Sequence, residues 1–100
     1  MNYGRAMQGV CQMDNQIFAI SGTQTNDENS SFKKCEKFDL ITRVWSPIAD
    51  CLVASSGCVV VPFNQRYIVK VGGKINLFTP CNVIEFYDIY DNEWVIKINN

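Results

Sequence analysis

The sequence contains Cys35-Glu36-Lys37-Phe38-Asp39 and, after five further residues, Trp45. A second stretch, Ile84-Glu85-Phe86-Tyr87-Asp88, is followed by Trp94 at the same distance. The glutamate, the aromatic residue, the aspartate and the tryptophan therefore recur at an offset of 49 residues. Self-similarity at a fixed period of this size indicates a repeat architecture, in which each repeat is one supersecondary unit.

Two further blocks recur upstream of these stretches in the same order. Ile17-Phe18-Ala19-Ile20-Ser21-Gly22 matches Ile68-Val69-Lys70-Val71-Gly72-Gly73 at an offset of 51. Residues 6–9 match residues 54–57 at an offset of 48 through an alanine and a glycine. Three blocks in one order predict a duplication, with one copy in residues 1–50 and the other in residues 51–100.

Each copy consists of short strand patterns. Strands are predicted over residues 9–13, 17–21 and 34–39 of the first copy and over residues 57–61, 67–71 and 83–88 of the second, each copy ending in a strand that holds its tryptophan. The apolar run at residues 58–62 is typical of a strand packed on both faces. No segment has a sustained helical period, so no helix is expected. Four short antiparallel strands per repeat, with a period near fifty, indicate the blades of a β-propeller.

At this level of detail the chain resembles the kelch family. The repeat of that family has an arginine near its start, an I-Y-V-I-G-G strand, a V-E-x-Y-D-P strand and a tryptophan six residues after the aspartate. The first copy supplies these features from Arg5 to Trp45 and the second from Ile68 to Trp94. The resemblance covers essentially the whole chain and implies an all-β fold, namely two four-stranded antiparallel blades of a kelch-type β-propeller with an incomplete ring.

Four departures from the family pattern stand out. Ser21 replaces the first glycine of copy one, and Leu40 or Ile89 stands where the family prefers proline. The early arginine is absent from copy two, where the offset of 48 makes Val53 its counterpart. Lys70 occupies a position where the family has an apolar residue. Because a buried ammonium is costly, we expect Lys70 to reach water or to meet a carboxylate such as Glu85.

The repeated motif residues are predicted to be structural. The tryptophans and the aromatic residues before them fill the space between adjacent blades, and the acidic residues accept hydrogen bonds from backbone amides beside turns. The glycines suit a sharp exit from a strand or the close approach of another backbone. The predicted structural set is Gly22, Glu36, Phe38, Asp39, Trp45, Gly72, Gly73, Glu85, Tyr87, Asp88 and Trp94.

Composition excludes several classes of protein. Of the 100 residues, 47% are hydrophobic and the net charge is −1, which a disordered tail would not show. Nine basic residues against ten acidic ones argue against nucleic-acid binding, and the longest apolar run, Cys58–Pro62, is far too short to span a membrane. Histidine is absent, which removes the usual general base and metal ligand. We therefore predict no catalytic residue, no metal site and no cofactor.

The five cysteines contain no C-x-x-C spacing. Their odd number, without an export signal, predicts reduced thiols and a cytoplasmic location. Cys11 and Cys58 lie within strand patterns and are expected in the core. Cys35, Cys51 and Cys81 lie at strand edges or in loops, so one of them is expected to be accessible.

The resemblance implies a function in partner binding. Kelch propellers commonly present loops to a protein or peptide, in many members as the substrate-recruiting part of a ubiquitin-ligase adaptor. The alternative is a fragment of a kelch-type propeller enzyme, a copper oxidase or a sugar epimerase, whose active site lies in other blades. Two blades leave open sheet faces, so further blades or self-association are expected to cover them.

The loops after the glycines are the predicted contact face. Residues 23–34 form a long polar stretch, whereas residues 74–82 are fewer and include Leu77 and Phe78. Loops carry recognition in repeat arrays, because the strands are occupied by packing. The resemblance places the following residues on this face, with the first of them near its rim: Arg5, Asn26, Asp27, Glu28, Lys74, Asn76 and Phe78.

Overall fold

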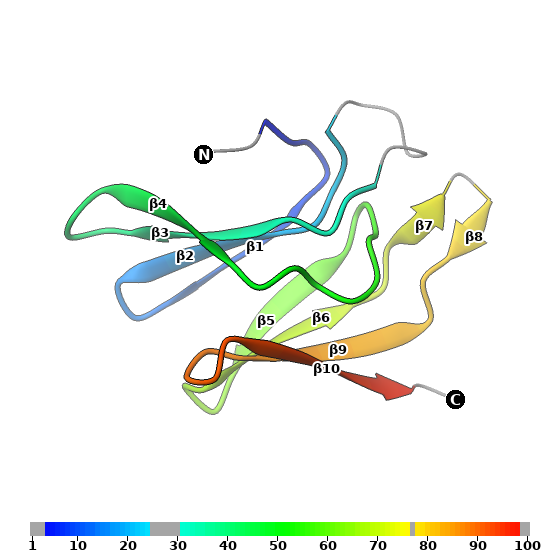
Figure 1. The fold of residues 1–100 in the computed structure, drawn as a ribbon. Helices are drawn as coiled ribbons and strands as arrows, with labels where there is room; N and C mark the ends of the chain where they lie inside the picture. Colours follow the sequence, from blue (N-terminus) through cyan, green and yellow to red (C-terminus); the bar gives the residue numbers. More distant parts are fainter. Residues whose placement is uncertain (1–3, 25–30, 77, 99–100) are drawn as a thin grey trace.

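The computed structural model describes residues 4–24, 31–76 and 78–98, and all regular structure in them is β-strand. The first sheet contains β1 (Gly9–Met13), β2 (Gln16–Ile20), β3 (Cys35–Asp39) and β4 (Val44–Ile48) in chain order. The second contains β5 (Val59–Phe63), β6 (Tyr67–Val71), β9 (Val83–Asp88) and β10 (Glu93–Ile98), again with sequential neighbours side by side. Between β6 and β9, β7 (Lys74–Asn76) and β8 (Thr79–Pro80) form a two-stranded ribbon (Figure 1).

All strand pairs of the two large sheets are antiparallel, which confirms the predicted fold class. The part of the chain that the structure describes contains no helix, as expected, and hence none long and apolar enough to cross a membrane. The ribbon differs from the sequence-based prediction, in which residues 74–82 form a loop.

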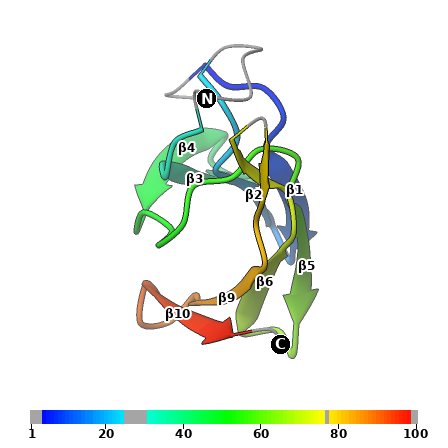
Figure 2. The ribbon, with the colours of Figure 1, turned by 90° about the vertical axis from the view of Figure 1, so that its right-hand side faces the viewer.

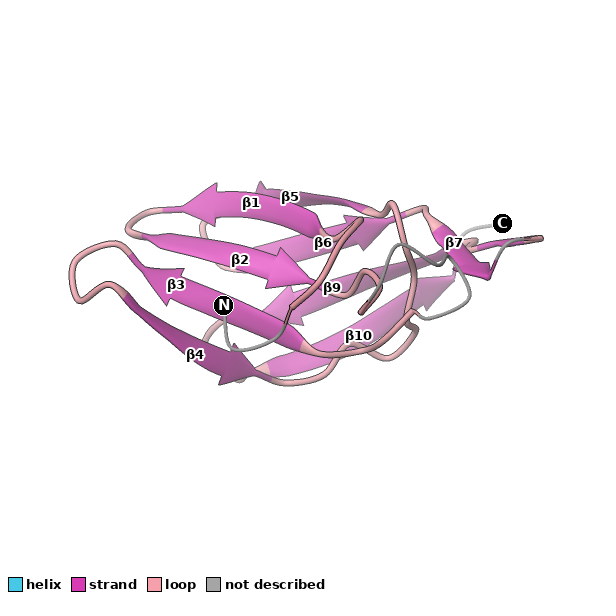
Figure 3. Cartoon of the chain, turned by 90° about the horizontal axis from the view of Figure 1, so that it is seen from above, coloured by secondary structure: helices cyan, strands magenta, loops and turns pink. Residues whose placement is uncertain are grey.

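The two sheets face each other as layers (Figure 3). Strands β1 and β5 lie against each other, and from there the sheets diverge towards β4 and β10 (Figure 2). The layers are therefore wedge-shaped, as sectors of a propeller are.

Alternation along the strands creates the core between the sheets. Phe18 and Ile20 of β2 point towards the second sheet, while Ile68 of β6, Tyr87 of β9 and Trp94 of β10 point towards the first. All five side chains are buried, and the ring centres of Phe18 and Tyr87 are 6.3 Å apart. Because alternate residues face opposite sides of a strand, the neighbours of these residues lie on the outer faces of the sheets.

The strand register corrects one part of the repeat alignment. Ala6 bridges to Thr23 and Ser56 bridges to Lys74 in the same antiparallel manner, so residue 6 corresponds to residue 56 at an offset of 50 rather than 48. Accordingly β5 begins at Val59, not at residue 57. Gly57, with φ of +68°, instead forms the bend before that strand. The counterpart of Arg5 is therefore Ser55 rather than Val53. A two-residue slip was hidden in the sequence because only an alanine and a glycine anchored that block.

Two glycines allow close contact between backbones. A Cβ atom on Gly22 would lie 2.6 Å from the carbonyl oxygen of Ala6, and one on Gly73 would lie 2.5 Å from that of Ser56. Both residues also have φ in the left-handed region, at +93° and +86°. Gly72 has φ of +73° but open space around it, and Ser21 adopts the same conformation at the equivalent place, with φ of 56°. The predicted close approach is thus confirmed for Gly22 and Gly73.

We predict that Gly73→Ala destabilises the chain more than Gly72→Ala. Gly72→Ala adds only the cost of a left-handed alanine, about 1 kcal/mol. Gly73→Ala adds a clash with backbone as well, for a total of about 3 kcal/mol. Urea unfolding followed by tryptophan fluorescence measures both values. Equal losses for the two variants would show that the backbone approach at Gly73 is not a constraint.

Candidate functional site

A buried ion pair lies at the centre of the interface between the sheets. Lys70 on β6 and Glu85 on β9 are cross-strand partners, with 3.1 Å between Nζ and Oε2. Both side chains are almost fully buried. Lys70 therefore meets the acidic partner that the sequence analysis named.

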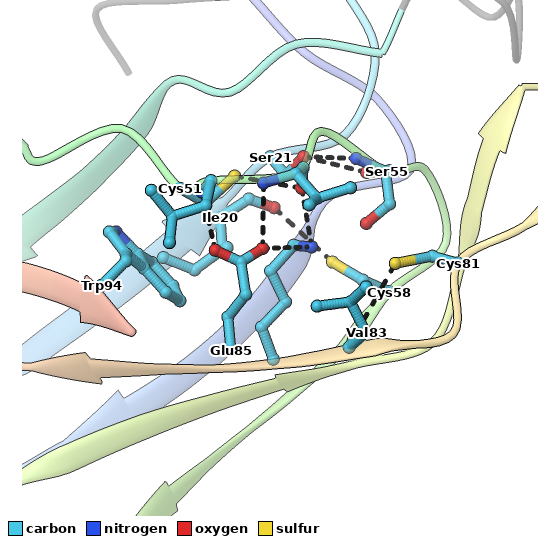
Figure 4. A network of polar contacts seen from close by, with 12 residues as sticks. Ile20, Ser21, Cys51, Ser55, Cys58, Cys81, Val83, Glu85 and Trp94 are labelled. Atoms are coloured by element: carbon cyan, nitrogen blue, oxygen red, sulfur yellow. Dashed lines mark hydrogen bonds and ion pairs between the residues drawn. The ribbon is translucent and has the colours of Figure 1, made fainter. Parts of the chain in front are cut away.

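The same pair binds the segment that connects the two sheets. The Glu85 carboxylate accepts hydrogen bonds from the amides of Leu52 (2.6 Å) and Val53 (3.2 Å), and Lys70 Nζ donates to the carbonyl of Val53 (2.9 Å). Figure 4 shows Glu85 within this network, close to Cys51 and Trp94. The ion pair thus holds the segment that connects the two blades against the second blade.

The first sheet has an equivalent site with a different cation. Glu36, the counterpart of Glu85, lies 3.0 Å from Nη2 of Arg5, and both side chains are buried. Arg5 Nη1 also donates to the carbonyls of Ser21 (2.9 Å) and Lys34 (2.7 Å). The expectation that Arg5 lies near the rim of a contact face is therefore corrected. Its guanidinium is enclosed because it neutralises Glu36 and satisfies backbone carbonyls.

One electrostatic requirement accounts for two departures from the family pattern. At the place of Arg5 the second repeat has Ser55, and at the place of Ala19, the cross-strand partner of Glu36, it has Lys70. A buried carboxylate without a cation is strongly unfavourable. The second repeat thus supplies its cation from the adjoining strand, whereas the first supplies it from the segment before β1.

The charge of Lys70 persists over the whole physiological range. Burial alone would lower its pKa, but the carboxylate of Glu85, which pairs with the ammonium and accepts its hydrogen bond, holds the pKa above its usual value. The group is therefore a permanent cation and an anchor, not a base.

Other polar contacts join the two blades at their end near the connecting segment. Ser21 Oγ accepts a hydrogen bond from the amide of Ser55 (2.9 Å) and lies 2.8 Å from the carbonyl oxygen of Phe32. The amide of Gly22 donates to the carbonyl of Ser55 (3.0 Å). The serine that replaces a family glycine therefore adds hydrogen bonds that glycine could not make.

The aromatic motif residues have a matched geometry in the two repeats. Phe38 and Trp45 have ring centres 5.1 Å apart, and Tyr87 and Trp94 have theirs 5.0 Å apart. Trp94 fills the space between the blades, as predicted, and its Nε1 donates to the carbonyl of Ala49 (2.9 Å). Trp45, on the outer face of the first sheet, is only half-buried.

Tyr87 adds a polar contact at the edge of this interface. Its hydroxyl donates to Asn92 Oδ1 (2.7 Å), which also accepts from the amide of Ala49 (2.9 Å). Burial raises the pKa of Tyr87 to about 12. The hydroxyl therefore stays protonated and keeps this hydrogen bond at physiological pH.

The two aspartates of the motif close the turns after β3 and β9. Asp39 Oδ1 accepts from the amides of Ile41 (2.8 Å) and Thr42 (3.1 Å), and Asp88 Oδ1 accepts from those of Tyr90 (3.0 Å) and Asp91 (3.3 Å). These bonds to backbone amides confirm the predicted role of the aspartates.

The cysteines are arranged differently from the expectation. Cys35, Cys51 and Cys81 are all buried, and Cys11 is the least buried of the five. Cys35 joins the core from β3, and Cys51 joins it from the segment that connects the two sheets. Burial raises the pKa of the Cys11 thiol to about 11. A hydrogen bond between the thiols of Cys35 and Cys51 lowers the pKa of Cys35 and raises that of Cys51. Within the described ranges, no group of three Cys, Asp or Glu side chains could hold a metal ion.

Apart from Arg5, the predicted contact residues that the structure describes lie on the ribbon or in its turn. Phe78, at the ribbon's turn, has 88% of its surface exposed, and Asn76 Oδ1 accepts a hydrogen bond from its amide (3.0 Å). Lys74 is exposed at the base of β7, beside a hollow of about 350 Å³ that Met7 and Gly57 also line. Asn26, Asp27 and Glu28 lie outside the described residues. The ribbon is at the end of the molecule opposite to the turns β5–β6 and β9–β10 (Figure 1).

The sequence analysis missed a groove on the outer face of the second sheet. Its volume is about 420 Å³, and Tyr67, Phe86 and Val95 provide its apolar lining, with acidic residues of the β9–β10 turn at one end. The signal in the sequence is the apolar residues at outward-facing positions of β6, β9 and β10, namely Tyr67, Phe86 and Val95.

Comparison with protein families decides the identity of the repeat. Residues 4–52 match the Kelch motif, which covers all four strands of the first sheet. The chain is a kelch-repeat protein. Its second repeat shares the strand order, the aspartate-closed turn and the aromatic pair of the first. Kelch repeats are typically interaction modules without catalytic activity, and no curated protein matches the chain.

We predict that Lys70→Met destabilises the chain by about 3–5 kcal/mol, because it leaves Glu85 buried without a cation. Lys34→Met is the matched control, since Lys34 and Asp50 form an ion pair that is about half exposed, and it costs less than about 1 kcal/mol. Urea unfolding of both variants measures the difference.

The pH dependence of this stabilisation follows from the raised pKa of Lys70. The advantage of the wild type over Lys70→Met is constant below the ordinary lysine pKa of 10.5 and is lost as the pH rises through the higher pKa of the folded state. An advantage that disappears near neutral pH would contradict the assignment of a permanent ammonium.

Proposed function

We propose that the chain is a protein-interaction module that binds a protein or peptide partner with the end of the molecule that carries the β7–β8 ribbon. The observation that carries the proposal is the exposed ring of Phe78 at the ribbon's turn. A protruding aromatic side chain can anchor an interface by entering an apolar pocket of the partner.

The surroundings of Phe78 support this role. Ile75 of β7 is partly exposed, and Lys74 and Asn76 add polar groups on the same ribbon. The hollow beside Lys74 offers the partner a concave surface at the base of the same ribbon. Asn26, Asp27 and Glu28 belong to this contact face in the proposal on the strength of the kelch resemblance alone.

Three finer points are part of the proposal. Residues 1–50 and 51–100 are the two blade units, the module serves as the substrate-recruiting part of a ubiquitin-ligase adaptor, and it works in the cytoplasm. The five free cysteines support a reducing compartment. The alternative, a fragment of a propeller oxidase or epimerase, would require active-site residues from other blades.

Phe78→Ala tests the contact face, with Tyr90→Ala as the matched control. Tyr90 is also a largely exposed aromatic residue, but it lies in the β9–β10 turn at the opposite end. We expect Phe78→Ala to reduce partner capture at least tenfold with an unchanged melting temperature, and Tyr90→Ala to leave capture unchanged. Capture of the partner is measured on the immobilised chain, and the amount captured is expressed per folded molecule of that chain. A Phe78→Ala variant that melts earlier yet binds normally would show that Phe78 belongs to the packing and that the contact face is misplaced.

A further inference from the structure

Apolar side chains stand on the outer face of each sheet at positions whose counterparts in the other repeat are buried on the inner face of the other sheet. Val10 on the outer face of the first sheet is 53% exposed, whereas its counterpart Val60 is 6% exposed between the sheets. Phe63 on the outer face of the second sheet is 51% exposed, whereas its counterpart Met13 is 7% exposed. Each outer face thus keeps the chemistry of a buried face without a neighbour to cover it.

The two outer faces correspond to the two halves of the interface that already exists. The outer face of the first sheet carries Phe38 and Trp45, which correspond to Tyr87 and Trp94 on the inner face of the second. The outer face of the second sheet carries Val69 and Val71, which correspond to Phe18 and Ile20 on the inner face of the first. A chain with both halves exposed has the elements needed to bind its own copies.

We infer that the chain associates head-to-tail with a second copy of itself. The outer face of the second sheet of one copy packs on the outer face of the first sheet of the next, in continuation of the interface between the two blades. The occupant of each open face is therefore another copy of this chain. This contact lies on the sheet faces and is independent of the partner proposed for Phe78.

Differences between the two halves favour burial of the outer face. Phe86 and Val95 stand on it where Lys37 and Ser46 stand on the inner face of the first sheet, so the outer face is the more apolar at these positions. In this contact, β5 of one copy and β1 of the next lie farther apart than β1 and β5 do within one chain. The reason is that Val59 occupies the place of Gly9. A Cβ atom on Gly9 would already lie 3.0 Å from Val60. The contact is consequently centred on the row that contains Val61, Val69, Phe86 and Val95.

Such an interface joins different faces, and repetition of it gives a ring if the rotation closes. Propellers typically have about four to eight blades.

Charge substitutions on each face test the inference with the full chain. Val10→Lys blocks the outer face of the first sheet and Val61→Lys blocks that of the second. Both side chains are substantially exposed, so the fold is retained, which circular dichroism checks. Ile41→Lys, in the exposed turn after β3, is the matched control with the same change of charge. Sedimentation equilibrium of the wild type and of Ile41→Lys is expected to give an oligomer, and each blocking variant is expected to weaken association more than tenfold.

Mixing the two blocking variants distinguishes head-to-tail association from other modes. Each variant keeps one intact face, so an equimolar mixture is expected to form a one-to-one dimer although neither variant associates alone. Pro47→Lys and Val95→Lys, exposed on the same two faces, repeat the test if either first variant misfolds.

Three results would overturn the inference: a wild-type chain that stays monomeric at high micromolar concentration, a blocking variant that associates as the wild type does, or folded blocking variants whose mixture stays monomeric. Phe78→Ala separates this inference from the proposed partner site, because it is expected to leave association unchanged. Loss of partner capture with intact oligomers, or the reverse, identifies which of the two surfaces has been misassigned.

Discussion

A carboxylate buried on a face of a β-sheet must have a cation and N–H donors within hydrogen-bond distance, and this constraint organises both repeats. Glu85 has Lys70 and two backbone amides, and Glu36 has Arg5. Because those donors come from distant parts of the chain, each glutamate fixes strands and connecting segments relative to one another. The cation can come from different positions, provided that it reaches the same place in space. That freedom explains why the family arginine is missing from the second repeat while the fold is kept.

The fold could be predicted from the sequence because its information is local and repeated. The alternation of apolar residues, the aspartates that close turns and the paired aromatic residues recur in both copies. The assignment of strands in one copy therefore supports the assignment in the other. For Lys70 the sequence leaves two outcomes, access to water or a carboxylate such as Glu85, and the structure has the second. The match at the start of the repeat was two residues out of register, because an alanine and a glycine carry little information about register.

The burial of individual side chains could not be predicted with the same success. Arg5 was expected near a rim and one of the cysteines at 35, 51 and 81 was expected to be accessible, but all of these side chains are enclosed. For Cys51 the reason is that the segment between β4 and β5 passes between the sheets and takes part in the core. Burial there depends on the packing of two sheets, which no local pattern in one strand encodes. The ribbon β7–β8 was missed for a related reason, since its strands are too short to show an alternating pattern.

The alternation that builds the core also determines what the molecule presents outside. A strand with apolar residues at consecutive positions, such as β5, has two apolar faces, and a single chain of two sheets can cover only one of them. The other face keeps the side chains of an interface without its neighbour, while the β7–β8 ribbon remains at the end of the molecule. Surfaces for assembly and for recognition are therefore separated by the geometry of the repeat. Substitutions on the assembly surface can change association while the recognition surface retains its chemistry. This independence is the basis for assigning two surfaces rather than one.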